Sequence, residues 1–172
     1  MKIGERLPYF ELPAATGETF TLNQVMEKSC ILVIFISNAC PYVQAYAKRI
    51  QDLVQHFYED NMGVIMVNSR SSQSHPSESL EAMKEFLVQH SFKHVWYLKD
   101  EEASLASQLG AKVTPEAFLF NSKRELVYQG AIDDAWDQPN LVTRIYLEDA
   151  IEYTLDGLEV DFPETEAIGC QL

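Results

Sequence analysis

Residues 30–41 read Cys-Ile-Leu-Val-Ile-Phe-Ile-Ser-Asn-Ala-Cys-Pro. The apolar run from Cys30 to Ile36 is rich in β-branched residues, which is typical of a strand buried on both faces. Pro41 suits the first position of a helix, because its φ is fixed and that position needs no N–H donor. Apolar residues then recur every three or four positions from Val43 to Phe57, which predicts a helix with one buried face that ends near Gly63. The stretch therefore predicts a strand, a turn and a helix, with Cys40 at the turn.

Short elements precede this unit. Residues 9–12 and 18–21 alternate weakly on either side of Thr16-Gly17, which predicts a small hairpin. Thr21 and Gln24 have the spacing of a capping box, so a short helix is expected over residues 22–27.

Strands and helices alternate after the unit as well. Residues 63–68 predict a second buried strand, which a polar loop at 69–77 connects to the next helix. The other expected elements follow in order: a helix with Leu80, Met83, Phe86 and Leu87 on one side, a strand at 94–98, a short helix opened by Asp100 and closed by Gly110, strands at 117–120 and 125–129, and a helix at 141–155. This order predicts an α/β fold in which helices cover both faces of a mixed sheet.

The chain has 172 residues and a formal net charge of −13. A chain of this length buries about two-thirds of its unfolded surface, so its fold needs neither disulfides nor a structural metal. We interpret residues 1–172 as a single domain in which residues 157–172 form a C-terminal tail. The acidic balance argues against nucleic-acid and membrane partners, and no segment has the length of a signal peptide or a transmembrane span. We therefore expect a cytoplasmic protein whose cysteines are free, buried or catalytic.

Cys40 lies at or next to the N-cap of the helix that Pro41 opens. There its sulfur faces unpaired backbone N–H groups and the positive end of the helix dipole, and both favour the thiolate. The thiolate is the form that attacks disulfides and peroxides. We therefore interpret Cys40 as a nucleophile; the alternative is a small buried apolar residue, the commonest fate of a free cysteine.

Pro115 precedes the strand expected at 117–120 and follows Val113 and Thr114. A cis bond before this proline would turn the preceding backbone outward, so that Thr114 could pair with an extended substrate. The alternative is an ordinary trans proline at the start of an edge strand.

Taken in order, these features resemble the thioredoxin fold, and four segments resemble the redoxin or AhpC/TSA-like (peroxiredoxin-like) family of small bacterial proteins. The segments are residues 38–46 (Asn-Ala-Cys-Pro-Tyr-Val-Gln-Ala-Tyr), 114–120 (Thr-Pro-Glu-Ala-Phe-Leu-Phe), 130–134 (Gly-Ala-Ile-Asp-Asp) and 168–170 (Ile-Gly-Cys). The resemblance covers nearly the whole chain. It implies a thioredoxin-like three-layer α/β/α structure with a central mixed sheet and an N-terminal β-hairpin extension.

The resemblance also implies roles for individual residues. Cys40 takes the place of the attacking cysteine, Pro115 that of the cis-proline facing it, and Thr114 that of the residue whose backbone docks substrate. Ser37 has the place of a hydroxyl that can hydrogen-bond a peroxide or the thiolate, and Pro41 completes the Cys-Pro pair that often opens the helix in peroxiredoxins. Ser37, Pro41, Thr114 and Pro115 are therefore the expected substrate-binding residues.

Three positions depart from the patterns of the related families. Val43 stands where thioredoxins have their second cysteine, so reduction within one loop is excluded. Ile34 replaces the buried acid that thioredoxins carry six residues before the first cysteine, and Val33 replaces the proline that peroxiredoxins carry seven residues before theirs.

Cys170 is the expected resolving thiol. The cost of loop closure grows only logarithmically with length, so the long separation is no barrier to a mobile tail that folds back over Cys40. The alternative is an inert thiol on a disordered tail. Cys30, at the opposite end of the strand from Cys40, is expected to be a core residue.

We expect no cofactor and no metal. The histidines at positions 56, 75, 90 and 94 lack metal-ligand spacing, and no HExxH, CxxC or Gly-rich phosphate loop occurs. Peroxiredoxins use an arginine near the thiolate, for which Arg49, Arg124 and Arg144 are the candidates. Asp133, Asp134 and Asp137 could bind a cation, but such residues more often form a solvated turn; by resemblance Asp133 and Asp134 lie near the active face. Glu116 could assist proton transfer near Cys40, although we expect an exposed carboxylate at a strand end.

Two functions follow from these observations. The first is a thiol-dependent oxidoreductase in which Cys40 attacks an oxidised sulfur or a hydroperoxide, and Cys170 or an external thiol resolves the product. Its partners would be a protein or small-molecule disulfide, or a hydroperoxide, together with an external thiol reductant, and the chain would be a monomer or homodimer. The second is a non-catalytic thioredoxin-like module for redox sensing or partner binding, which the missing second cysteine favours.

Overall fold

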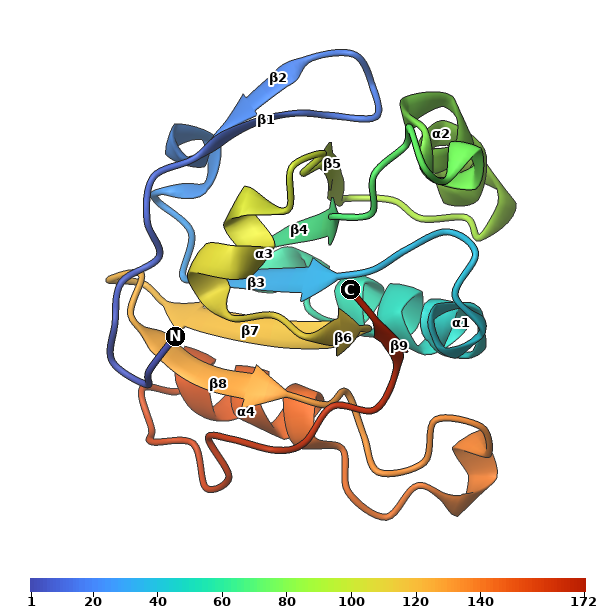
Figure 1. Cartoon of the computed structure of the whole chain (residues 1–172). Helices are drawn as coiled ribbons and strands as arrows, with labels where there is room; N and C mark the ends of the chain where they lie inside the picture. The colour runs from blue at the N-terminus through green and yellow to red at the C-terminus, as the bar shows by residue number, and fades with distance from the viewer.

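A five-stranded sheet forms the centre of the computed structural model, which describes residues 1–172 (Figure 1). Its strands lie in the order β5 (Trp96–Lys99), β4 (Met62–Asn68), β3 (Cys30–Phe35), β7 (Glu116–Asn121) and β8 (Leu126–Gly130). The first three are mutually parallel, whereas β7 runs antiparallel to both β3 and β8. The predicted mixed sheet is confirmed.

β3 is the central strand because both of its faces are apolar. All of its residues are buried, and they pair with β4 on one side and with β7 on the other. Leu32 and Ile34 pack into one hydrophobic core, and Ile31, Val33 and Phe35 pack into a second. The continuous apolar run therefore contributes to two cores, as expected for a strand that is covered on both faces.

Helices lie on both faces of the sheet and produce the expected three layers (Figure 1). α1 (Pro41–His56), α2 (Leu80–Gln89) and α4 (Tyr146–Leu155) pack on the first core. The second core is covered by α3 (Ser104–Leu109), the 3-10 helix η1 (Leu22–Val25) and the hairpin of β1 (Glu11–Pro13) and β2 (Thr19–Thr21). Not one of these helices has the length and apolar character needed to cross a membrane.

Two helices are shorter than their sequence patterns predict. α1 ends at His56, because the 3-10 helix η2 (Tyr58–Asp60) follows and Asn61 adopts a left-handed conformation with φ of 58°. α4 begins at Tyr146 instead of residue 141. The reason is that the Asp134 carboxylate accepts the backbone N–H and the hydroxyl of Thr143 and holds that segment outside the helix.

The two short helices on the second core, η1 and α3, also differ from their predicted bounds. The helix expected over 22–27 is the four-residue η1, although the predicted capping box of Thr21 and Gln24 is present. Asp100 does not begin α3 but lies before it, where its carboxylate accepts the N–H groups of Leu105 and Ala106. The polar loops contain two further 3-10 helices, η3 (Pro76–Glu78) and η4 (Pro139–Leu141).

The C-terminal tail, residues 157–172, lies along the sheet (Figure 1). The backbone N–H of Gln129 in β8 donates to the carbonyl of Pro163 at 2.9 Å, and the carbonyl of Gln129 accepts the N–H of Thr165 at 3.1 Å. Gly130 permits this close approach, since a Cβ there would collide with Thr165. The tail ends in β9 (Cys170–Gln171), which pairs antiparallel with β6 (Val113–Thr114). This pairing brings the last cysteine to the carboxyl end of β3.

Candidate active site

Cys40 lies between the carboxyl end of β3 and the first turn of α1. It is the N-cap residue of α1, and its carbonyl accepts the N–H of Gln44 at 3.0 Å. Pro41 occupies the first helical position, as predicted, and its side chain is exposed. The Cys40 sulfur makes no capping hydrogen bond to the helix and is bonded to the sulfur of Cys170.

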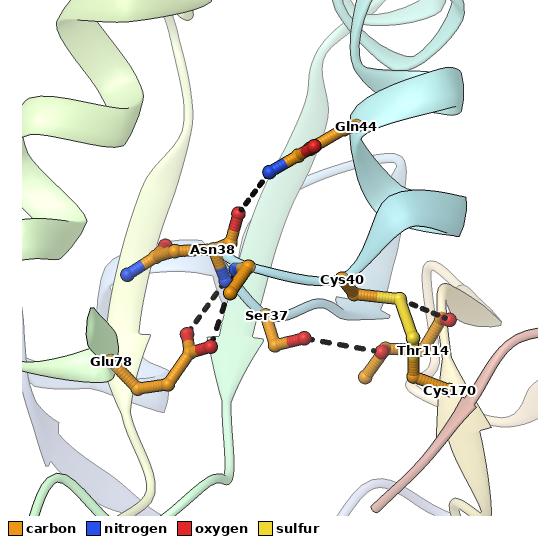
Figure 2. The surroundings of a disulfide bond; sticks show 8 residues. Ser37, Asn38, Cys40, Gln44, Glu78, Thr114 and Cys170 are labelled. Atoms are coloured by element: carbon orange, nitrogen blue, oxygen red, sulfur yellow. Dashed lines mark hydrogen bonds between the residues drawn. A yellow bond between two sulfur atoms is a disulfide. The ribbon is translucent and has the colours of Figure 1, made fainter. Parts of the chain in front are cut away.

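A disulfide joins Cys40 to Cys170 (Figure 2). Their Cα atoms are 6.2 Å apart, although 130 residues separate them in the sequence. The register of β6 and β9 places Cys170 opposite Thr114. The tail leaves Cys40 only 3% exposed, so in this form the sulfur is closed to solvent.

Thr114 and Pro115 border the disulfide. The carbonyl oxygen of Thr114 lies 3.4 Å from the Cys40 sulfur, and the Thr114–Pro115 peptide bond is cis. The buried hydroxyls of Ser37 and Thr114 lie 3.4 Å apart. The structure thus gathers Ser37, Thr114, Pro115 and both cysteines at one end of the sheet.

A buried carboxylate, which the sequence analysis missed, holds the turn before Cys40. Glu78 is 2% exposed and accepts the backbone N–H of Asn38 at 2.6 Å and that of Ala39 at 3.2 Å (Figure 2). The carbonyl of Asn38 in turn accepts the side-chain amide of Gln44 at 3.1 Å. Nothing in the polar sequence around Glu78 indicates that this one carboxylate turns inward.

A polar network surrounds Glu78. The side-chain amide of Asn68 donates to Glu78 at 2.9 Å and to the Tyr97 hydroxyl at 3.1 Å. The ammonium of Lys99 donates to the Asn68 side chain and to the backbone carbonyls of Glu78 and Arg70. Burial lowers the pKa of Lys99, while the charges of nearby carboxylates oppose that shift. The network therefore fixes the segment that carries Glu78 and, through it, the turn before Cys40.

We expect Glu78→Ala to lower the free energy of unfolding by about 3 kcal/mol, because it leaves the N–H groups of Asn38 and Ala39 without an acceptor and removes one of the two acceptors of the Asn68 amide. Urea denaturation of the reduced protein measures this quantity. Glu78→Gln keeps a carbonyl oxygen at the same place and should retain a large part of the stability. An alanine variant as stable as the parent protein would show that Glu78 does not hold the turn.

The arginines considered for the thiolate have other partners. Arg124 lies against the sulfur of Met26, and Arg144 lies over the ring of Phe162. Arg49 binds carbonyl and carboxylate oxygens in a separate cluster. None of these contacts includes Cys40. No group of three or more histidine, cysteine, aspartate or glutamate side chains is placed to hold a metal ion.

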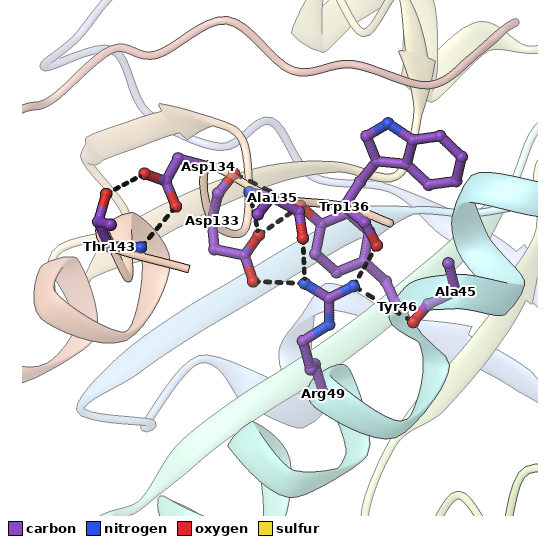
Figure 3. Close-up of polar contacts among 8 residues, drawn as sticks. All are labelled: Ala45, Tyr46, Arg49, Asp133, Asp134, Ala135, Trp136 and Thr143. Carbon is purple, nitrogen blue, oxygen red and sulfur yellow. Dashed lines mark hydrogen bonds and ion pairs between the residues drawn. The ribbon is translucent and has the colours of Figure 1, made fainter. Parts of the chain in front are cut away.

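The cluster around Arg49 joins α1 to the loop after β8 (Figure 3). Arg49 donates to the Asp133 carboxylate at 2.8 Å, and Asp133 accepts the Tyr46 hydroxyl at 2.7 Å. The guanidinium carbon also lies 4.1 Å from the centre of the Tyr46 ring. Burial raises the pKa of Tyr46, and the hydrogen bond to Asp133 adds to the shift. Asp133 is thus a buried ion-pair partner, and its interpretation as part of a solvated turn is wrong, whereas Asp134 and Asp137 are exposed as predicted.

Glu116 is half-buried instead of exposed at the strand end. Its carboxylate accepts the backbone N–H groups of Lys112 at 2.7 Å and Val113 at 3.2 Å. Glu116 therefore fixes the segment that carries Thr114.

Cys30 lies at the opposite end of β3 from Cys40. Its thiol is free and fully buried, which confirms its interpretation as a core residue. Burial raises the pKa of this thiol to about 12, and the charge of Asp60 makes a smaller contribution in the same direction. The fraction of thiolate at Cys30 is therefore very small at neutral pH.

We expect iodoacetamide to label Cys30 in the native reduced protein at pH 8 about a thousandfold more slowly than a free thiol, because only the thiolate reacts. Mass spectrometry of the labelled peptide measures the rate. Labelling in urea is the control and should proceed at the rate of a free thiol. Fast labelling of Cys30 in the native protein would contradict its burial.

Comparison with known proteins places the chain in a family. The family model described as "AhpC/TSA family" matches residues 3–129. No curated protein sequence matches the chain. A solved structure of a hypothetical protein from Sinorhizobium meliloti 1021 is 32% identical, with a TM-score of 0.91 over 99% of this chain and 93% of that chain.

Two structures of lower identity share the fold. Peroxidoxin BcpB from Mycobacterium tuberculosis is 18% identical, covers 91% of this chain and 95% of its own, and has a TM-score of 0.67. A putative thiol:disulfide interchange protein DsbE from Chlorobium tepidum is 19% identical, covers 91% and 97% respectively, and has a TM-score of 0.65. These similarities confirm the thioredoxin-like fold. Since the family model also spans most of the sequence, the chain belongs to the AhpC/TSA family.

Proposed function

We propose that this protein is a thiol–disulfide oxidoreductase in which Cys40 is the nucleophile and Cys170 the resolving thiol. The observation that carries the proposal is the bond between these two sulfurs beside Thr114. Membership of the AhpC/TSA family supports oxidoreductase chemistry at a coarse level. We also propose that residues 1–172 act as a single domain, since the tail packs on β8 and β6 and supplies the second cysteine.

The reaction needs two exchanges of sulfur bonds. In the first, the Cys40 thiolate attacks one sulfur of a substrate disulfide, the substrate S–S bond breaks, and the other substrate sulfur leaves as a thiolate. In the second, the Cys170 thiolate attacks the Cys40 sulfur and releases the remaining substrate thiolate. The substrate gains two electrons, and the protein is left with the Cys40–Cys170 disulfide. An external thiol reductant then restores both thiols.

A disulfide on an extended backbone fits the site better than a hydroperoxide does. β9 lies on β6 as a strand, with Cys170 opposite Thr114, so the site already holds a cysteine in this conformation. The three candidate arginines, Arg49, Arg124 and Arg144, contact groups other than Cys40, so none of these three is placed to polarise a peroxide there. The hydroxyl of Ser37 has the Thr114 hydroxyl as its partner.

Two parallel assays test the proposal. Insulin reduction with dithiothreitol measures disulfide exchange, and consumption of hydrogen peroxide under the same conditions measures peroxidase activity. We expect the protein to reduce insulin faster than dithiothreitol alone does. A Cys40 mixed disulfide with insulin should be trapped when an alkylating agent stops the reaction early. Faster peroxide consumption with a Cys40 sulfenic acid would replace the proposed substrate by a hydroperoxide. Formation of the Cys40–Cys170 disulfide without turnover in either assay would overturn catalysis and assign a redox sensor.

A further inference from the structure

The docked tail shows which thiols the site can accept. We infer that Cys40 exchanges preferentially with a cysteine whose preceding backbone carbon is an unsubstituted methylene, as in glycyl-cysteine or the γ-glutamyl-cysteine of glutathione. This inference rests on the proposed function and adds a substrate class to it. Its basis is the contact between Gly169 and the backbone of Thr114.

Gly169 lies directly against the backbone of Thr114 and Pro115, which forms the wall of the site. A Cβ on Gly169 would collide with the carbonyl oxygen and carbon of Thr114, and it would lie 3.2 Å from the Pro115 nitrogen. These are backbone atoms, which cannot turn aside as a flexible side chain can. The residue before the docked cysteine therefore has room for hydrogen alone.

The wall has little freedom to move. Thr114 is 1% exposed, and its hydroxyl lies 3.4 Å from that of Ser37. Glu116 binds the backbone N–H groups of the two residues before Thr114. Because Ser37 contacts the Thr114 side chain and Glu116 holds the two residues before it, a branched carbon at the place of Gly169 would force the incoming chain away from β6.

An external thiol that bonds to Cys40 has to place its sulfur where that of Cys170 lies. If its backbone pairs with Thr114 in the register of the tail, its preceding carbon takes the place of Gly169. In glutathione the cysteine is acylated by the γ-carboxyl group of glutamate, so this carbon is a CH2 group. In the isomer with an ordinary α-linkage, the same carbon carries an amino group and a side chain. The site should therefore distinguish two tripeptides of identical composition.

The other side of the docked cysteine is open. Gln171 and Leu172 are exposed, and a groove of about 800 Å³ runs beside them between Lys112, Glu116 and Glu166. The residue after the cysteine is thus not restricted by size. Both tripeptide isomers end in the same glycine carboxylate, so the charges beside the residue after the cysteine meet the same group in each. The acetylated dipeptides carry no charge next to the cysteine, so that pair isolates the steric effect.

The test uses the full chain with Cys170→Ser, which leaves Cys40 without its internal partner. The Cys40 thiolate attacks one sulfur of a symmetrical disulfide, the S–S bond breaks, and one peptide thiolate leaves and takes a proton from solvent. Mass spectrometry follows the mixed disulfide at Cys40. The probes are glutathione disulfide, the disulfide of α-Glu-Cys-Gly, and the disulfides of acetyl-Gly-Cys-amide and acetyl-Ala-Cys-amide.

We expect each unbranched probe to react about tenfold faster or more than its branched counterpart, since the displacement of a packed backbone is costly. Rates within a factor of about two of each other in both pairs would overturn the inference. If acetyl-Gly-Cys-amide disulfide reacts faster than the alanyl probe, but glutathione disulfide and its α-linked isomer react at equal rates, the class is restricted to glycyl-cysteine peptides and glutathione is excluded.

Hydroxyethyl disulfide has no peptide backbone, so it tests the reactivity of Cys40 toward disulfides separately from its preference among peptides. If Cys40 reacts with this probe but does not discriminate within the pairs, only the substrate class fails. If Cys40 is inert toward it, the proposed function fails as well. Cys170→Ala, measured in parallel, provides the same comparison should serine at this position disturb folding.

Discussion

Cys40→Ser is expected to lower turnover in disulfide exchange by at least about a thousandfold, because a neutral hydroxyl does not replace a thiolate as the nucleophile toward sulfur. No other thiol can take its place. Cys30 is fully buried at the far end of β3, and Cys170 lies on the tail and has only Cys40 as its partner. Insulin reduction under saturating dithiothreitol measures the loss.

The matched control for this variant is Cys30→Ala. It removes the other buried cysteine without altering the site, so turnover should stay within about twofold of the parent protein if Cys30 only packs. Thermal unfolding of both variants in the reduced form shows whether either loses structure. A folded Cys40→Ser variant that keeps a tenth or more of the parent turnover would exclude Cys40 as the nucleophile.

Gly169→Ala is expected to slow formation of the Cys40–Cys170 disulfide by about 10- to 100-fold. The new Cβ would collide with the Thr114 carbonyl, and forcing extra atoms into a packed site costs about 1–3 kcal/mol. β9 would then no longer lie on β6 in the register that places Cys170 opposite Thr114. Quenched oxidation of the reduced protein, followed by mass spectrometry of the linked peptide, gives the rate.

Gln171→Ala is the control for the tail. Gln171 lies on the other side of Cys170, its side chain is exposed, and alanine there adds no atom against Thr114. This variant should form the disulfide at the parent rate. Equal rates for Gly169→Ala and the parent protein would show that the tail reaches Cys40 without the close contact at Gly169.

Local sequence patterns predicted the fold well where each element depends on its own residues. The apolar run at 30–36 predicted β3, because a strand covered on both faces needs no polar positions. Pro41 marked the start of α1 correctly. The start of α4 could not be predicted in this way, because Asp134 and Thr143 form a contact that no local periodicity expresses.

Some residues of the candidate site could be predicted from the sequence, and others depend on contacts between distant segments. Cys40, Thr114, Pro115 and Ser37 were identified from motifs and resemblance, and the structure places them together. Glu78 was missed, because its sequence neighbours are polar and only the packing of η3 beside β4 turns its carboxylate inward. Resemblance also suggested an arginine for the thiolate, whereas Arg49 is bound by Asp133.

The sequence by itself determined the order along the chain of the five strands of the central sheet and of the four α-helices, and it determined which cysteine precedes a helix and which lies at the far end of β3 in the core. Those properties depend on periodicity, fixed φ angles and apolar composition within short windows. Only the tertiary structure decided that Cys170 meets Cys40 and that a glycine must precede it. That outcome depends on the pairing of β9 with β6, which joins parts of the chain that are far apart in sequence and is set by backbone register and steric fit.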